Sequence, residues 1–75
     1  MVTYLYRSKV GLFRIYPWNG RWALEIEGEI YGSYHSPVAA ADDVYLHETG
    51  YDPWDLRPDG PNDPPDLSEW EVFRI

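Results

Sequence analysis

The dipeptide Asn19-Gly20 separates two runs in which apolar and polar side chains alternate, residues 10–17 and residues 21–27. Asparagine and glycine both tolerate the positive φ angles of a type I′ turn, so this dipeptide between alternating runs is a strong signal for a β-hairpin. Alternation also places successive side chains on opposite faces of a sheet. The sequence therefore predicts an antiparallel hairpin at the centre of the fold.

Two further strands are predicted, one on each side of this hairpin. Residues 2–7 alternate in the same way and lead through a turn at Ser8-Lys9 into the strand at residues 10–17. After the hairpin, Glu27-Gly28 or Gly28-Glu29 turns the chain into a strand at residues 30–34. Residues 1–35 are thus expected to form a β-meander, in which each strand pairs with the next one along the chain.

The next segment carries the signals of a single α-helix. Ser36 is a favourable N-cap, and Pro37 suits the first helical position, where its missing N–H group is not needed. Gly50 is a typical residue to end a helix, so we expect the helix to cover residues 37–49. With about 3.6 residues per turn, the stripe expected to face the sheet consists of Ala40, Ala41, Val44, His47 and Glu48.

Three apolar residues of the predicted helix, Val38, Tyr45 and Leu46, fall outside this stripe and need another segment to cover them. The proline-rich segment 51–75 is the candidate, because it also contains large apolar side chains that a disordered linker would lack. We therefore expect an ordered, extended tail wrapped over the helix. The anchors predicted for this tail are Trp54, Leu56, Leu67, Trp70 and Phe73.

The end of the chain allows two local structures. Residues 69–75 alternate well enough for a short last strand, whereas residues 66–70 suit a helical turn. With either ending, the sequence predicts an α+β fold in which an antiparallel sheet of three to five strands packs on one α-helix. The chain is expected to form a single domain (1–75), made of the sheet (1–35), the helix (36–50) and an ordered acidic, proline-rich tail (51–75).

Acidic side chains are concentrated in the second half of the 75-residue chain, whose formal net charge is −7. Residues 1–35 carry four basic and three acidic side chains, whereas residues 36–75 carry two basic and ten acidic ones. A phosphate backbone or an anionic membrane would be repelled by that second half. The chain contains no cysteine and no long apolar run, so we expect a cytoplasmic protein that does not enter a membrane and is a monomer by default.

No combination of residues predicts catalysis or a bound cofactor. A Ser-His-Asp order, a glycine-rich phosphate loop and paired carboxylates beside an apolar pocket are all missing, so we expect no enzymatic activity. Asp43 and His47 have the spacing of two helical metal ligands, but a site needs a third convergent ligand and none is predicted. His35 has no acidic or nucleophilic neighbour in the sequence that would make it a general base. We therefore expect neither a metal nor a cofactor.

The centre of the sequence carries a set of short motifs in a fixed order. They are Pro17-Trp18, the run GRWALEI at residues 20–26, Gly32-Ser33-Tyr34 and Ala40-Ala41. Through these motifs, residues 12–48 resemble the DNA-binding domain of the ethylene-response-factor type in plants and its phage and bacterial relatives. The resemblance implies a three-stranded antiparallel sheet packed on one helix, with the other face of the sheet inserted into the major groove of DNA.

A second pattern extends beyond these motifs. It runs from Ser36-Pro37 through the helix to Thr49-Gly50 and Trp54-Asp55. With it, the whole chain is similar to a family of small uncharacterised bacterial proteins. This similarity implies a family but no activity.

Alternation and the first resemblance select the same residues as a candidate binding face of the sheet. One face is expected to pack on the helix, which leaves the opposite face for a partner. Tryptophan, tyrosine and arginine are the residue types that most often anchor protein interfaces. The helix-facing residues are expected to be Phe13, Ile15, Trp22, Leu24 and Ile26, and the candidate face consists of Arg14, Tyr16, Trp18, Arg21, Glu25 and Glu27.

Three interpretations of this face stay open. A protein partner is favoured, because Glu25 and Glu27 share the predicted face and the acidic half of the chain would oppose a polyanion. Duplex DNA, contacted through Arg14, Trp18 and Arg21, is the alternative. The third interpretation is that a terminal strand or the tail covers the face and makes it part of the core. The sequence thus predicts a small, acidic, non-enzymatic binding module whose partner is an unknown protein rather than a nucleic acid.

Overall fold

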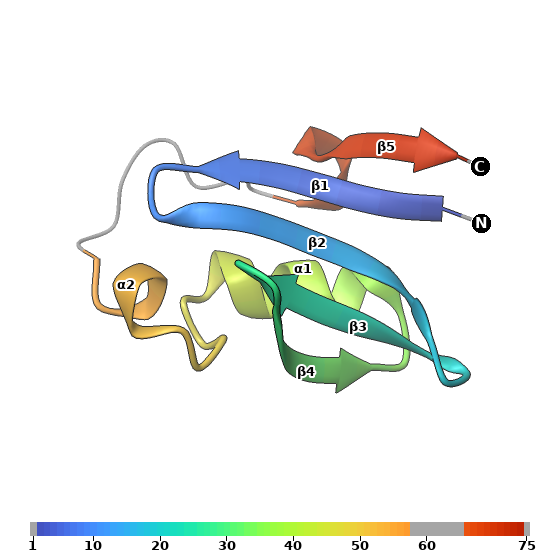
Figure 1. Ribbon diagram of the computed structural model, residues 1–75, viewed down its shortest axis with the longest axis horizontal. Coiled ribbons are helices and arrows are strands. Elements are labelled where there is room, and N and C mark those ends of the chain that lie inside the picture. Colours follow the sequence, from blue (N-terminus) through green and yellow to red (C-terminus); the bar gives the residue numbers. More distant parts are fainter. Residues whose placement is uncertain (1, 58–65, 75) are drawn as a thin grey trace.

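A computed structural model describes residues 2–57 and 66–74 of the chain. Its elements in chain order are β1 (Val2–Ser8), β2 (Gly11–Trp18), β3 (Arg21–Ile26), β4 (Glu29–Tyr34), α1 (Pro37–Tyr45), α2 (Asp52–Asp55), the 3₁₀ helix η1 (Leu67–Glu69) and β5 (Glu71–Arg74). The five strands form one antiparallel sheet in the order β4-β3-β2-β1-β5, and α1 packs against it (Figure 1). This confirms the predicted α+β fold, with the largest strand number that the sequence allowed.

Two-residue turns connect the three strands β2, β3 and β4. Asn19 and Gly20 have φ angles of 52° and 76°, as the sequence predicts for a turn of the type I′ kind. Glu27 and Gly28, with φ angles of 51° and 89°, make the next turn, which is the first of the two predicted alternatives. Both hairpins are therefore determined by residues that tolerate the left-handed region of the backbone.

The turn between β1 and β2 lies one residue later than predicted. Ser8 pairs with Gly11, so Lys9 and Val10 form the turn. The Ser8 hydroxyl accepts a hydrogen bond from the Val10 N–H at 3.2 Å and donates one to the Gly11 carbonyl oxygen at 2.7 Å. These side-chain bonds stabilise a turn whose two residues do not have positive φ angles.

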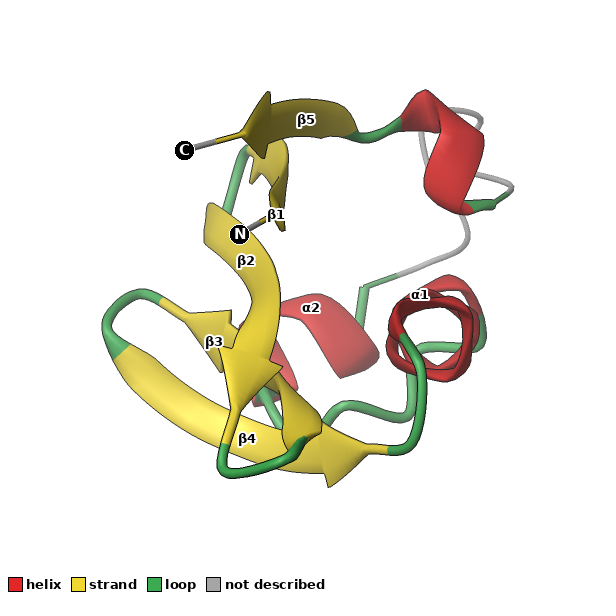
Figure 2. Ribbon diagram, turned by 90° about the vertical axis from the view of Figure 1, so that its right-hand side faces the viewer, coloured by secondary structure: helices red, strands yellow, loops and turns green. Residues whose placement is uncertain are grey.

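The sheet buries one face against α1, and Figure 2 shows α1 and α2 on this side of the sheet. The predicted helix-facing residues of β2 and β3 are fully buried, except for Trp22, which is partly buried. Ala40, Ala41 and Val44 of α1 complete this core. The small side chain of alanine lets the helix approach the sheet closely, which leaves room for the large aromatic side chains nearby.

α1 begins where the sequence predicts but ends earlier. Ser36 is the N-cap, and its hydroxyl oxygen accepts a hydrogen bond from the Ala39 N–H at 3.1 Å. The helix ends at Tyr45 rather than at Thr49. The prediction that Gly50 ends the helix is therefore wrong.

A Schellman motif ends α1, with His47 in the left-handed position that glycine most often takes. The His47 N–H donates to the Val44 carbonyl oxygen at 3.1 Å, and the Glu48 N–H donates to the Asp43 carbonyl oxygen at 2.9 Å. The His47 ring stacks on Trp54 with 4.7 Å between ring centroids, and its Nδ1 lies 2.9 Å from the Trp54 carbonyl oxygen. These contacts stabilise a backbone conformation that is less favourable for histidine than for glycine, and so they end the helix early.

The chain after α1 returns to the core, as the sequence predicts for its two tryptophans. Trp54 is fully buried, and its indole N–H donates to the Val44 carbonyl oxygen at 2.8 Å. Trp70 is also buried, and Leu67 packs against the same core. The other two predicted anchors are exposed: Leu56 and Phe73.

Both predicted endings of the chain occur, one after the other. Asp66 caps η1 by accepting a hydrogen bond from the Ser68 N–H at 2.8 Å, and bonds from Ser68 lower the pKa of the Asp66 carboxyl. β5 follows directly and pairs antiparallel with β1, where Val72 lies opposite Tyr4. The last strand therefore extends the sheet at its β1 edge.

Among the described residues, no segment of the tail covers the outer side of α1. Val38, Tyr45 and Leu46 are 56%, 50% and 58% exposed, so the prediction that the tail buries these three side chains is wrong. The physical reason is that both tryptophans of the C-terminal part are buried in the core that the sheet and α1 share. The predicted wrap of the proline-rich residues 58–65 lies outside the described residues.

A hydrogen bond between β4 and α1 fastens the helix to the sheet. The Tyr34 phenol donates to Asp43 Oδ2 at 2.7 Å. Burial raises the pKa of Tyr34 far above its ordinary value, and the bond to the Asp43 carboxylate raises it further. The folded state therefore favours the protonated phenol.

We expect Tyr34→Phe to lower the free energy of unfolding by about 1 kcal/mol at neutral pH, because it removes this hydrogen bond. The raised pKa means that the stabilisation is fully present below the ordinary tyrosine pKa of about 10 and is lost as the pH rises above it. Urea unfolding of both proteins across this range measures the difference, and the other tyrosines cancel because both proteins contain them. A difference that stayed constant at the alkaline end would contradict this explanation.

The two buried tryptophans differ in one respect that can be measured. Trp54 Nε1 has the Val44 carbonyl oxygen as its partner, whereas Trp70 Nε1 has no hydrogen-bond partner among the described residues. Substitution by phenylalanine removes a similar volume at each position. We expect Trp54→Phe to destabilise the protein more than Trp70→Phe by about 1 kcal/mol in urea unfolding, the contribution of one hydrogen bond. Equal losses would show that packing alone decides the effect.

Candidate functional site

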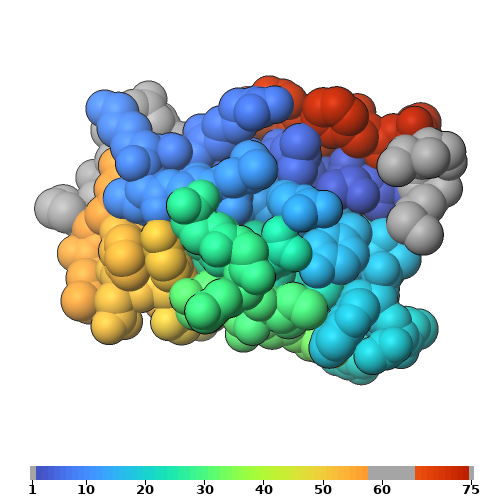
Figure 3. All heavy atoms as spheres, in the orientation of Figure 1, coloured from blue at the N-terminus to red at the C-terminus, as the bar shows by residue number. Residues whose placement is uncertain are grey.

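The face of the sheet opposite α1, which we call the open face, is not covered by any helix or strand in the described part of the chain. Figure 1 views the molecule from this side, with α1 behind the sheet, and Figure 3 shows the same side as a surface. Strand register brings together five of the six residues of the predicted face, all except Glu27. The strand register places on the open face, among others, Leu5, Arg14, Tyr16, Trp18, Arg21, Glu25, Ile30, Ser33 and Phe73, and beside them the exposed ion pair of Arg7 and Glu71.

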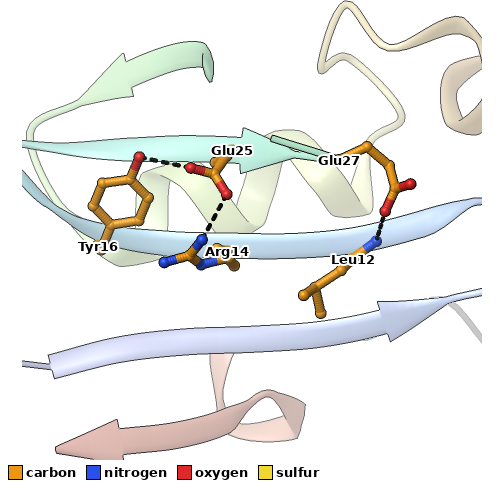
Figure 4. A network of polar contacts seen from close by, with 5 residues as sticks. All are labelled: Leu12, Arg14, Tyr16, Glu25 and Glu27. Atoms are coloured by element: carbon orange, nitrogen blue, oxygen red, sulfur yellow. Dashed lines mark hydrogen bonds and ion pairs between the residues drawn. The ribbon is translucent and has the colours of Figure 1, made fainter. Parts of the chain in front are cut away.

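A polar network occupies the centre of the open face. Glu25 lies opposite Arg14 in the β2–β3 pair, and its carboxylate accepts a hydrogen bond from Arg14 Nη1 at 2.9 Å. The same carboxylate accepts a second bond from the Tyr16 hydroxyl at 2.9 Å (Figure 4). The Glu25 side chain is only 14% exposed, so water competes little for these bonds. Glu25 therefore fixes both neighbours.

The network determines the electrostatics of this part of the face. Burial raises the pKa of Tyr16, and the hydrogen bond to Glu25 raises it further. The Arg14 guanidinium also lies over the Tyr16 ring, 5.3 Å from its centroid, in a cation–π arrangement. The positive charge of Arg14 is balanced by Glu25, so the centre of the open face is rigid and close to neutral.

Arg21 is held by neutral groups at one side of the face. Its Nε donates to the Ser33 hydroxyl at 2.6 Å, and its Nη2 donates to the Ser33 carbonyl oxygen at 3.1 Å. Within the described ranges, Arg21 has no carboxylate at ion-pair distance. Its guanidinium is thus oriented but keeps its charge, which is available to a partner.

Glu27 departs from the predicted face because it lies in the β3–β4 turn rather than in a strand. Its carboxylate accepts a hydrogen bond from the Leu12 N–H at 3.0 Å (Figure 4). Its side chain also packs over Gly11, where a Cβ atom would come within 2.6 Å of Glu27 Cγ. Glu27 therefore supports the backbone of β2 at this end of the hairpin.

Exposed apolar side chains surround the polar centre. Trp18, Ile30 and Phe73 are 40%, 42% and 46% exposed. Ile30 and Phe73 were not part of the predicted face. Phe73 lies opposite Thr3, and alternation in the two outer strands would have placed both on this face. Ile30 is opposite Glu25 because a β-bulge shifts the register of β4, which alternation within one strand does not reveal.

In the described part of the chain, the titratable residues outside the open face do not form a metal site. Asp43 is the acceptor for the Tyr34 phenol, and His47 Nδ1 is directed at the Trp54 carbonyl oxygen. His35 is exposed on the segment before α1. Across residues 2–57 and 66–74, no group of three potential metal ligands is brought together.

Comparisons with protein-family models, with curated proteins and with solved structures found no match for this chain. The resemblance to the ethylene-response-factor type of DNA-binding domain therefore stays a prediction. None of the described helices is both long and apolar enough to cross a membrane.

The role of Glu25 can be tested through its effect on Tyr16. We expect Glu25→Gln to lower the pKa of Tyr16 towards the ordinary tyrosine value without restoring it, because burial is the larger cause of the shift and remains. A pH titration followed by ¹³C NMR of the tyrosine rings measures this. The internal control is Tyr34, whose partner is Asp43 and whose pKa should not change. An unchanged Tyr16 pKa would mean that the carboxylate does not control the phenol.

Proposed function

We propose that this protein is a non-enzymatic binding module that recognises another protein through the open face. The observation that carries the proposal is the network of Arg14, Tyr16 and Glu25 at the centre of that face. The network balances the central positive charge and holds an aromatic ring in place. The face then offers tryptophan, tyrosine and arginine, the residue types that are enriched at protein interfaces, and its central charges are paired rather than left without a partner.

Pre-organisation supports the same proposal. Trp18 lies opposite Arg21, and Ile30 lies opposite Glu25, so these two exposed apolar side chains are each next to a polar side chain that hydrogen bonds hold in place. A partner would remove these apolar side chains from water, which is the main favourable contribution to association. Because the polar side chains are already ordered, little conformational entropy remains to be lost when the partner binds.

Duplex DNA is the second candidate, since β2, β3 and β4 with α1 match the sheet and helix that the predicted resemblance implies. DNA binding depends on cations that neutralise phosphates. On the open face, Arg14 already has Glu25 as its partner, and the formal net charge of the chain is −7. These charges favour a protein with a basic or mixed surface over a polyanion.

A photo-reactive amino acid at position 18 tests the proposal in the cells that express the protein. We expect position 18 to form covalent adducts with one or a few proteins. The matched control is position 56 on the other side of the sheet, because Leu56 is 78% exposed and is not part of the open face. Adducts that were equally frequent from both positions would contradict the proposal.

Trp18→Ala gives the quantitative prediction. We expect it to weaken binding of the identified partner by about tenfold or more, as for an aromatic anchor at an interface. The stability should fall by only about 1 kcal/mol, or about 4 to 8 °C in melting temperature, because Trp18 is 40% exposed in the free protein and only partly packed. A large loss of stability would mean that Trp18 belongs to the core instead.

Binding of duplex DNA to the open face can be tested separately. ¹⁵N-labelled full-length protein is titrated with a short duplex at low and moderate salt. DNA binding would give peak shifts confined to β2 and β3 that become smaller with Arg14→Ala, with Arg21→Ala and with added salt. That result would identify DNA, and not a protein, as the partner of the open face. Flat spectra would remove DNA from consideration.

A further inference from the structure

The side of α1 that faces away from the sheet carries apolar side chains with helical spacing. Val38 is followed by Asp42 at i+4, Tyr45 at i+7 and Leu46 at i+8, so the four residues lie along one side of the helix. All four are exposed. We call Val38, Asp42, Tyr45 and Leu46 the outer stripe.

Folding alone does not account for the apolar members of the outer stripe. The other side of α1 already supplies the core residues Ala40, Ala41 and Val44. At an exposed helix position, Lys, Gln or Glu has a higher helix propensity than Val or Tyr. Val38 and Tyr45, two turns apart on the same side, therefore indicate a surface that another molecule removes from water.

The charged side chains of the outer stripe and of the residues next to it in the chain are acidic only. Residues 36–56 contain no Lys or Arg, whereas they contain five Asp or Glu. Asp42 within the stripe and Glu48 just after it are exposed, and neither makes an ion pair with another described residue. The first basic residue after this segment is Arg57, whose guanidinium lies over the Trp54 ring at 5.3 Å from its centroid. The stripe thus combines apolar contacts with uncompensated negative charge.

We propose that the outer stripe binds a basic amphipathic helix of a partner protein. The apolar side chains of that helix would pack against Val38, Tyr45 and Leu46, and its Lys or Arg side chains would pair with Asp42 and Glu48. The spacing favours a helix, because residues at i, i+4 and i+8 form the ridge that fits the groove of a second helix. α1 has nine residues and a length of about 13 Å, so the contact covers about two turns of the partner. Such a small interface suits weak, reversible binding.

The outer stripe would bind its partner whether or not the open face binds another protein. α1 packs on one face of the sheet (Figure 2) and turns Ala40, Ala41 and Val44 towards it, so the outer stripe and the open face lie on opposite sides of the molecule. A partner on one surface therefore leaves the other accessible.

The experiment is an NMR titration of the ¹⁵N-labelled full-length protein with a synthetic helical peptide. In this peptide, leucine forms one side of the helix and lysine and arginine form the other. One control peptide has the same composition in scrambled order, and a second has glutamate in place of the basic residues. We expect saturable shifts at residues 38–48 with the amphipathic basic peptide only, and weaker binding in higher salt.

Variants of the full chain separate the contribution of apolar contact from that of charge. Val38→Ser with Tyr45→Ser should weaken binding by about tenfold or more through lost apolar contact. Asp42→Asn with Glu48→Gln should weaken it by about threefold and reduce its salt dependence. Trp18→Ala on the open face should leave binding unchanged. Equal binding of the scrambled peptide, shifts located on the open face, or the absence of saturation would each overturn the proposal.

Discussion

The fold depends on Trp54, which joins parts of the chain that local sequence does not connect. Its ring contacts Phe13 of β2 and Tyr6 of β1 edge to face, with 5.1 Å and 5.9 Å between ring centroids. Its indole N–H donates to the last turn of α1 at Val44, and its ring stacks with His47 just beyond the helix. One side chain thereby links the sheet, the helix end and the segment that follows. In a small domain without disulfides, such buried aromatic area replaces the size that the core lacks.

Local signals predicted those parts of the fold that neighbouring residues determine. Asn19-Gly20 and Ser36-Pro37 correctly placed the central hairpin and the helix start, because turn angles and capping bonds belong to the residues themselves. The predicted helix end was wrong, because the observed end depends on a contact between side chains that are not neighbours in the sequence. His47 takes the left-handed conformation in contact with Trp54, and the sequence does not show that the two rings meet. The position of Trp54 also explains why the predicted burial of Val38 was wrong. Trp54 is buried in the core and does not cover the outer side of the helix.

The sequence predicted those residues of the candidate site whose position depends only on the alternation of side chains along one strand. Alternation alone placed Arg14, Tyr16 and Trp18 on one face, because successive side chains must point to opposite sides of a sheet. The pairing of Arg14 with Glu25 depends on which residues of β2 and β3 lie opposite one another, and the turn at residues 19–20 sets that register. The position of Ile30 on this face depends on a β-bulge between β3 and β4, and alternation along a single strand does not predict a bulge.

The distribution of charge gives the two uncovered surfaces different chemistry. On the open face, Arg14 and Glu25 on adjacent strands cancel each other, whereas residues 36–56, which include α1, contain five acidic side chains and no basic one. Of the partners that we propose, the one at the open face meets paired charges, and the one at α1 meets acids that attract basic side chains.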